Sequence, residues 1–158
     1  MGQAARYWLI GDSCGREDLD NPERWLTPDA SGLPTPANRL LDLTGWTIST
    51  FLATFSPRTN LWSNPHRVWV AEGRAQAARI AEQSLKDGSD GVIVLGSLAA
   101  RMFDLQAEEA MEWRGRFAFV PHPALQSKQW LSPERRERGR AFFASLLHPP
   151  RDRRKTGG

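Results

Sequence analysis

Asp12, Asn60 and His122 have the residue types and the spacing expected of a catalytic site at the edge of a parallel sheet. Each lies at or just beyond the end of a short stretch with strong strand preference. The carboxyl ends of parallel strands share one edge of a sheet, where open α/β sheets bind their ligands. There, a carboxylate, an amide and an imidazole supply a proton acceptor, a paired donor and acceptor, and a group that titrates near neutral pH. The sequence therefore predicts a polar cleft at this edge.

Asp12 lies in a turn bounded by two glycines. The apolar run Tyr7–Ile10 leads directly into Gly11-Asp-Ser-Cys-Gly15. A short apolar run that stops at glycine is typical of a buried strand in a parallel sheet, and glycine lets the backbone approach a ligand closely. The pattern fits a site with Asp12 and Ser13 at its centre, and it equally fits a tight β-to-α turn without chemistry.

Of the three histidines, His122 is the one that follows a predicted strand. His66 lies at the start of a predicted helix, and His148 lies beside the C-terminal tail. His122 stands between two prolines just after the run Arg116–Val120. A lone histidine is more often structural than catalytic, but the two other polar strand ends at the same sheet edge favour a catalytic role for His122.

Strand and helix patterns alternate along the chain. Such alternation predicts βαβ units, in which helices cover both faces of a parallel sheet. We therefore predict one α/β domain, a three-layer α/β/α sandwich with a small parallel sheet of about four strands. The expected strands cover residues 7–10, 57–62, 91–96 and 116–120, and the expected helices cover 36–43, 49–55, 64–86, 97–103 and 132–147.

The longest expected helix has clear boundary signals. Asn64 suits the N-cap, Pro65 suits the first helical position, and Asp87-Gly88 suits the end. We expect its core face to comprise Val68, Ala71, Ala75, Ala78, Ile80, Ala81 and Leu85.

The tryptophans divide into two groups by their position along the chain. Trp8, Trp46 and Trp69 are expected in the core. Trp25, Trp62 and Trp130 lie near the predicted cleft, where a large aromatic ring either packs against the core or stacks on a base.

Length and charge predict one domain over residues 1–148 followed by a basic tail over 149–158. A chain of 158 residues is long enough to bury a single core. Four basic residues and one acidic residue after Pro149 account for the whole formal net charge of +3. We expect this Pro/Arg/Lys/Gly tail to be disordered. It either adds salt-dependent affinity for nucleic acid or is a plain solvated end.

Composition also excludes several classes of protein. One cysteine allows neither an internal disulfide nor a cysteine-ligated metal site, so we expect no metal and no cofactor. No apolar run approaches the roughly 20 residues that span a bilayer, and Tyr7–Ile10 is too short for a signal peptide. We therefore expect a cytoplasmic, intracellular protein that does not enter a membrane.

The order of the motifs resembles that of the uracil-DNA glycosylase superfamily. The resemblance covers roughly residues 7–147 and rests on Gly11–Gly15, Thr59-Asn60-Leu61, Val92–Phe103 and Phe119-Val-Pro-His-Pro123. It implies a parallel four-stranded sheet between helices and a monomeric enzyme without a cofactor. The implied reaction is hydrolysis of the N-glycosidic bond of a flipped-out uracil or modified pyrimidine in single- or double-stranded DNA. The lack of four cysteines excludes the superfamily's iron–sulfur branch.

The resemblance also implies roles for the residues of the cleft. Gly11 and its turn hold the base and position the hydrolytic water. Asn60 reads the hydrogen-bonding edge of the base, and Trp25 stacks on its ring. His122 lies beside the pyrimidine O2, where a donor stabilises the negative charge that develops as the bond breaks.

Three departures from the superfamily's pattern are visible, at Ser13, at Cys14 and after Pro123. Ser13 stands where the most active uracil enzymes carry Asp, so water activation falls to Asp12 or to no residue. Cys14 stands where many members carry Pro. After His122-Pro123 the superfamily continues with Ser and a strand-wedging segment, whereas this chain continues with Ala124. The DNA-contacting residues implied here are Leu125 as the wedge, Gln126, Ser127, and Lys128 on a phosphate.

Two other interpretations stay open. Gly11-Asp-Ser also resembles the esterases whose nucleophile is the serine of that tripeptide, with His122 as base and Asn60 as an oxyanion donor. Those esterases carry Asp three residues before the histidine, where this chain has Phe119. A non-catalytic domain that binds a nucleotide or DNA in the same pocket is the other interpretation.

Overall fold

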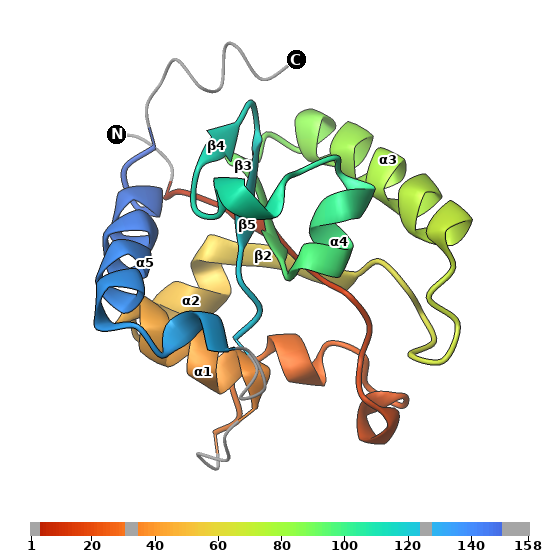
Figure 1. Cartoon of the computed structure of the whole chain (residues 1–158), viewed down its shortest axis with the longest axis horizontal. Helices are drawn as coiled ribbons and strands as arrows, with labels where there is room; N and C mark the ends of the chain where they lie inside the picture. The colour runs from red at the N-terminus through yellow and green to blue at the C-terminus, as the bar shows by residue number, and fades with distance from the viewer. Residues whose placement is uncertain (1–3, 31–34, 124–127, 150–158) are drawn as a thin grey trace.

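The computed structural model describes residues 4–30, 35–123 and 128–149. Its centre is a five-stranded sheet in the order β2-β1-β3-β5-β4 (Figure 1). Four strands are parallel, which confirms the predicted sheet. They are β1 (Tyr7–Gly11), β2 (Phe55–Asn60), β3 (Gly91–Leu95) and β5 (Phe117–Val120).

The fifth strand, β4 (Trp113–Arg114), was not predicted. It pairs antiparallel with β5 through a short turn. Gly115 in this turn has a φ of +59°, a conformation that glycine adopts without strain. A two-residue strand is too short to produce an alternating pattern, so the sequence carries no periodic signal for it.

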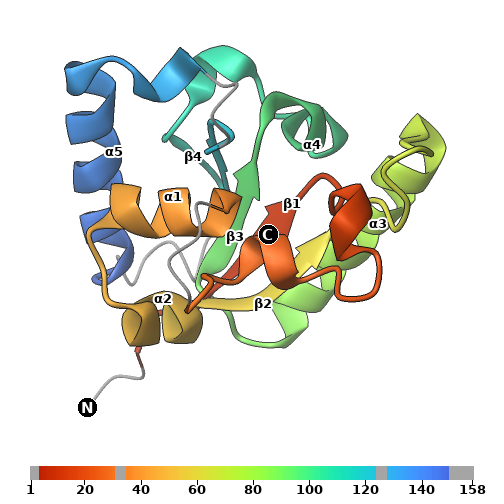
Figure 2. The ribbon, with the colours of Figure 1, turned by 90° about the horizontal axis from the view of Figure 1, so that it is seen from below.

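Helices cover both faces of the sheet, which confirms the three-layer α/β/α sandwich. In Figures 1 and 2, α1, α2 and α5 lie on one side of the sheet, and α3 and α4 lie on the other. The helices are α1 (Pro36–Thr44), α2 (Ile48–Thr54), α3 (Val70–Lys86), α4 (Ser97–Met102) and α5 (Pro133–Leu146). Short 3-10 turns are η1 (Arg16–Asp18), η2 (Arg24–Leu26), η3 (Ala107–Glu109) and η4 (Lys128–Trp130).

Alternation along β1 divides the interior into two cores. Tyr7 and Leu9 pack into the core on the α1/α2/α5 side, and Trp8 and Ile10 pack into the core on the α3/α4 side. All five residues of the strand are buried. Because successive side chains of a strand point to opposite faces, an unbroken apolar run is the pattern that a sheet covered on both faces requires.

The start and the core face predicted for α3 were wrong. The helix begins at Val70, because Asn64 makes a local turn in which its side-chain oxygen accepts from the His66 N–H at 2.9 Å. Its buried face comprises Gly73, Ala77, Ile80 and Ser84. Of the residues predicted to face the core, Ile80 is buried. Five others are exposed: Val68, Ala71, Ala75, Ala78 and Leu85.

Gly73 explains this choice of face. A Cβ on Gly73 would lie 2.5 Å from Cζ2 of Trp62 and 2.8 Å from the sulfur of Met102. The helix therefore approaches α4 and the segment after β2 at a residue without a side chain, and the fully buried Trp62 ring fills the space.

Among the tryptophans, the prediction for Trp69 was wrong. It is 64% exposed at the N-cap of α3, where its carbonyl accepts from Nε1 of Trp62 at 2.7 Å. Trp8, Trp62 and Trp130 are buried, and Trp46 packs at the margin of the core on the α1/α2/α5 side.

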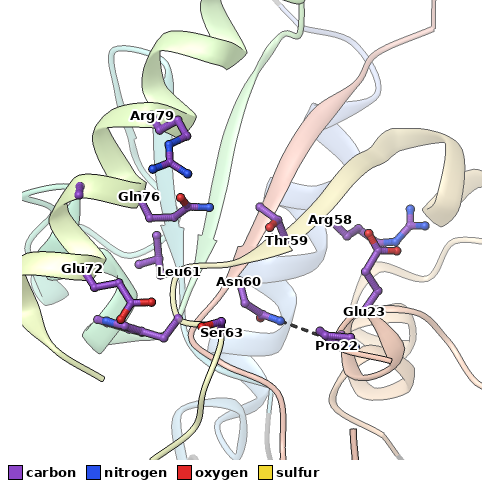
Figure 3. A pocket seen from close by; sticks show the side chains of 12 residues that line it. Pro22, Glu23, Arg58, Thr59, Asn60, Leu61, Ser63, Glu72, Gln76 and Arg79 are labelled. Carbon is purple, nitrogen blue, oxygen red and sulfur yellow. Dashed lines mark hydrogen bonds between the residues drawn. The ribbon is translucent and has the colours of Figure 1, made fainter. Parts of the chain in front are cut away.

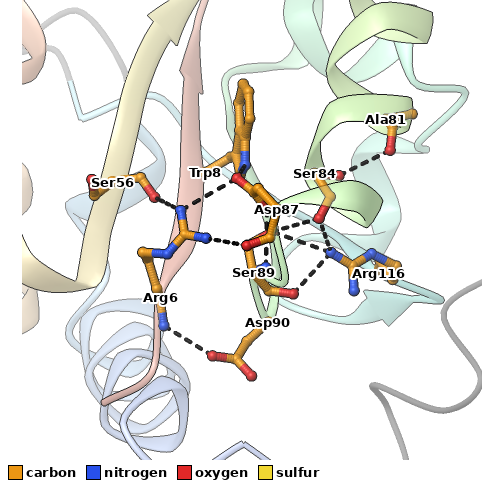
Figure 4. A network of polar contacts seen from close by, with 9 residues as sticks. All are labelled: Arg6, Trp8, Ser56, Ala81, Ser84, Asp87, Ser89, Asp90 and Arg116. Carbon is orange, nitrogen blue, oxygen red and sulfur yellow. Dashed lines mark hydrogen bonds and ion pairs between the residues drawn. The ribbon is translucent and has the colours of Figure 1, made fainter. Parts of the chain in front are cut away.

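A network of polar contacts ties together the amino ends of the strands (Figure 4). The Arg6 guanidinium donates to Ser56 O and Asp87 O at 2.9 and 2.8 Å. The buried Arg116 donates to the carbonyl oxygens of Ser84 and Ser89, both at 2.9 Å. These bonds satisfy loop carbonyls that would otherwise be buried without a partner, so they fix the sheet edge opposite the predicted site.

Candidate functional site

The carboxyl ends of β1 and β2 lie side by side. Gly11 is in register with Asn60, and the pairing continues past both strands. Leu61 N–H donates to Gly11 O at 3.0 Å, and Trp62 N–H donates to Asp12 O at 2.9 Å. The loop after β1 is thus fixed against the end of β2, as the sequence predicted for a site at this edge.

Trp25 joins the ends of three strands. Its Nε1 donates to Oδ1 of Asn60 at 2.9 Å. Its ring stacks on His122 with a centroid distance of 5.5 Å and an interplanar angle of 8°. A Cβ on Gly11 would lie 1.9 Å from Cζ2 of Trp25, so only glycine fits at position 11. The structure therefore brings together all four of these predicted site residues.

Both the oxygen and the nitrogen of the Asn60 side-chain amide form hydrogen bonds within the protein. Besides accepting from Trp25, it donates from Nδ2 to the Pro22 carbonyl at 3.2 Å (Figure 3). An indole N–H only donates and a carbonyl only accepts, so these partners fix which end of the amide is oxygen.

The surroundings of Asp12 disfavour the ionised form of its carboxyl group. Its Oδ1 is buried and has no hydrogen-bond partner among the described residues. Burial raises the pKa of Asp12 from its ordinary value of 3.8 to about 6, although a hydrogen bond from the Ala99 backbone opposes the shift. A carboxyl that titrates about one unit below neutral pH is suited to general-base work.

Asp12 and His122 are both neighbours of Gly96. A Cβ built on it would lie 3.4 Å from Cδ2 of His122 and 3.7 Å from Oδ1 of Asp12. Gly96 also has a φ of +89°, which other residues rarely adopt. Burial lowers the pKa of His122, so the imidazole is neutral at pH 7.

Ser13 and Cys14, which follow Asp12, make no described contact with Asn60 or His122. Ser13 is half-buried, and no described contact joins its hydroxyl to Asp12, Asn60 or His122. Cys14 is buried in the core as a free thiol.

A cavity of about 440 Å³ borders Asn60 and is lined by residues of β2 and α3 (Figure 3). Figure 3 shows Gln76 and Arg79 reaching over it from α3, opposite Asn60 and Arg58 on β2. Two arginines and two glutamates line it, so it has no excess of either charge: Arg58, Arg79, Glu23 and Glu72.

A second cavity, of about 370 Å³, lies beside His122 between α4 and α5. Arg135 and Arg138 line it together with Ser97 and Gln129. A neighbouring hollow of about 560 Å³ shares both arginines and adds Lys128. Glu108 lines the cavity beside the imidazole and Glu134 lines the neighbouring hollow, so the two together carry three basic and two acidic side chains. Arg138 also forms an ion pair with Glu112 at 3.3 Å.

Of the four predicted DNA-contacting residues, Lys128 is the one that the structure describes. It is exposed at the start of η4. Leu125, Gln126 and Ser127 lie outside the described residues, as does the tail after Pro149.

Sequence reasoning missed Gly96, Arg135 and Arg138. The signal for the arginines was the run Glu134–Arg140, in which four arginines occupy one helix. Nothing local marks Gly96, since its role depends on two residues that are distant in sequence.

The described ranges contain neither a group of three or more metal-ligating side chains nor a helix long and apolar enough to cross a bilayer. No protein-family model matches the chain, and a comparison with curated proteins finds no match.

Proposed function

We propose that this domain is a DNA glycosylase-like enzyme that hydrolyses the N-glycosidic bond of a flipped-out uracil or modified pyrimidine. One observation carries the proposal: a buried carboxylate and a neutral imidazole both border Gly96, at the sheet edge that also holds the amide of Asn60. Such a site offers a general base, a hydrogen-bond donor and an amide that can read the edge of a nucleobase, all at one edge of the sheet.

The reaction makes use of each group. Cleavage leaves negative charge on the departing base and positive charge on the sugar, and water supplies the hydroxyl that bonds to C1′. The neutral His122 imidazole donates a hydrogen bond to the base oxygen, and one such donor is typically worth about 3–4 kcal/mol. Above about pH 6 ionised Asp12 takes the proton of the attacking water.

The proposed partner is DNA. Lys128, Arg135 and Arg138 border the hollows beside His122. Each phosphate that such side chains neutralise adds affinity that falls as salt rises. A base inside a duplex hides its glycosidic bond, so the nucleotide must be extruded to reach this edge.

A gel assay tests the proposal. Labelled single- and double-stranded oligonucleotides carrying uracil, hypoxanthine or a 5-substituted pyrimidine are treated with protein and then with hot alkali, which breaks abasic strands. We expect breaks with the wild type and with the control His148→Ala, whose side chain is exposed. We expect at least a hundredfold fewer breaks with His122→Ala, since one lost donor costs roughly that factor.

A non-catalytic pocket is the second candidate, and the occupied amide of Asn60 favours it. Binding to the oligonucleotides without cleavage would support this candidate and reject hydrolysis. Cleavage of p-nitrophenyl acetate that disappears in Ser13→Ala would reject both and indicate an esterase.

A further inference from the structure

The Trp25 indole lies where the proposed function requires a base to lie. Gly11 borders its edge, His122 stacks on its face, and Asn60 accepts its N–H. The imidazole must therefore turn out of this stacked orientation before it donates to the oxygen of a base in the same place. A flat nitrogen heterocycle is thus already bound by the residues proposed to bind one. We refer to this space between Gly11, Asn60 and His122 as the ring slot.

Pro22 and Trp25 together present a particular hydrogen-bonding pattern to Asn60. The indole supplies a ring N–H at 2.9 Å from Oδ1, and the Pro22 carbonyl supplies an acceptor 3.2 Å from Nδ2. A ring N–H next to a carbonyl is the lactam edge of uracil and of hypoxanthine. The protein therefore makes to itself the pair of hydrogen bonds that such a base would make.

We propose that Pro22 and Trp25 are an internal substitute for the lactam edge of a base, and that a base enters the ring slot by displacing them. This inference rests on the proposed function for the kind of ligand. It adds that Trp25 competes with that ligand, in place of the stacking on the base that the resemblance implies, and so determines which bases bind.

Displacement of the two groups is coupled through the chain. Pro22 and Trp25 are three residues apart, so a shift of the segment Pro22–Trp25 releases both partners of Asn60 together. Buried residues on either side limit the movement, since Asp18 is 8% exposed and Leu26 is 1% exposed. The ion pair between Asp18 and Arg24 at 3.6 Å holds the segment itself and has to break or follow its shift.

The indole also defines the size and chemistry of the ligand. A ring slot that accepts a bicyclic indole has room for a purine-sized ring as well as for a pyrimidine. In uracil and hypoxanthine the donor is a ring nitrogen, so the ring overlays the indole. In cytosine the donor on that edge is an exocyclic amine, which moves the ring outward by one atom. We infer selectivity for lactam bases over cytosine.

The test vacates the slot by Trp25→Ala and measures binding of free uracil, hypoxanthine, cytosine and indole by calorimetry. We expect uracil and hypoxanthine to bind the variant at least about tenfold more tightly than the wild type, because the competing closed state is removed. Cytosine is expected to bind at least about tenfold more weakly than uracil. Trp69→Ala is the matched control, since its ring is exposed, and it should bind as the wild type does.

A second measurement uses the intact protein, so it does not depend on the folding of the variant. Tryptophan is replaced biosynthetically by 5-fluorotryptophan, and Trp25→Phe identifies the Trp25 resonance in the fluorine spectrum. Added uracil should shift this resonance and leave that of Trp69 in place.

The outcomes separate the inference from the proposed function. Base binding that leaves the Trp25 resonance unmoved would overturn the inference, as would a folded Trp25→Ala that binds indole but no lactam base. Equal binding of uracil and cytosine would also overturn it. Displacement of Trp25 by uracil without strand breaks in the gel assay would reject hydrolysis and retain the ring slot.

Discussion

Asp12 and His122, 110 residues apart in the sequence, both lie within 4 Å of the position that a Cβ on Gly96 would occupy. The positive φ of Gly96 is what turns the chain from β3 into α4 at this point. A Cβ here would make ordinary van der Waals contact with both ionisable groups, whereas the positive φ would strain the backbone of any residue other than glycine. The conformation of one glycine therefore sets the spacing of the proposed base and donor.

Gly96→Ala is expected to destabilise the domain and to reduce cleavage. The strain of a positive φ costs roughly 1–2 kcal/mol, and the new methyl group adds contact with the imidazole. Gly88→Ala is the matched control, since Gly88 has a φ of +75° with nothing within 4 Å of its Cβ position. Urea denaturation of both variants separates strain from contact. Equal losses of stability and full activity in Gly96→Ala would show that the shared position is unimportant.

Asp12→Asn is expected to change how stability depends on pH. The pKa of Asp12 is raised when folded, so the folded state holds its proton more tightly and the wild type loses stability as pH rises through about 6. The stability of the variant relative to the wild type should therefore increase by about 2 kcal/mol between about pH 4.5 and 7.5. Chemical denaturation across this range measures it, and a constant difference would contradict the buried carboxylate.

His122 is expected to titrate below its ordinary pKa of 6.5, because burial disfavours the imidazolium. Stability from this group is present above pH 6.5 and is lost as pH falls through the folded pKa. Imidazole proton resonances followed by NMR give the value, with His122→Asn for assignment. A pKa for His122 at or above 6.5 would be inconsistent with a desolvated, neutral donor.

Arg135→Ala and Arg138→Ala are expected to weaken DNA binding in a salt-dependent way. For each lost phosphate contact, the slope of log K against log salt should become shallower by roughly one. Arg140→Ala on the same helix is the control, because Arg140 lines a different hollow on the far side of α5 from His122. Fluorescence anisotropy with a labelled oligonucleotide measures the slopes. Identical slopes for all three variants would place the DNA elsewhere.

Gly73→Ala tests the packing of α3 against the sheet. Although alanine favours a helix, its methyl group would overlap Trp62 and Met102, and overpacking costs typically about 1–3 kcal/mol. We expect a lower midpoint in thermal denaturation. An unchanged or higher midpoint would mean that α3 sits further from the sheet.

Local patterns predicted the strands and the positions of Asn60 and His122 at their ends. A buried strand appears in the sequence as a run of consecutive apolar residues. Because the strands are parallel, the residues at their carboxyl ends lie at one edge of the sheet. Turn chemistry was less reliable. Asn64-Pro65 is a good helix start, yet its side chain closes a local turn and α3 starts six residues after Asn64.

The position of Trp25 was beyond local reasoning. Its contacts with Asn60 and His122 span 35 and 97 residues of chain, and no periodic pattern records a contact between loops. The prediction for the buried face of α3 was wrong for a similar reason. Glycine has a low helix propensity, and the role of Gly73 depends on its contact with Trp62, which the local sequence does not show.

The network around Arg6 and Arg116 has a consequence for the evolution of the domain. It anchors the amino ends of the strands with bonds that involve none of the residues of the ring slot. Architecture and chemistry thus occupy opposite edges of one sheet. Substitutions at exposed residues of the carboxyl edge therefore leave this anchor intact, whereas Trp25, which is 5% exposed in the core on the α1/α2/α5 side, is tied to the packing of the domain.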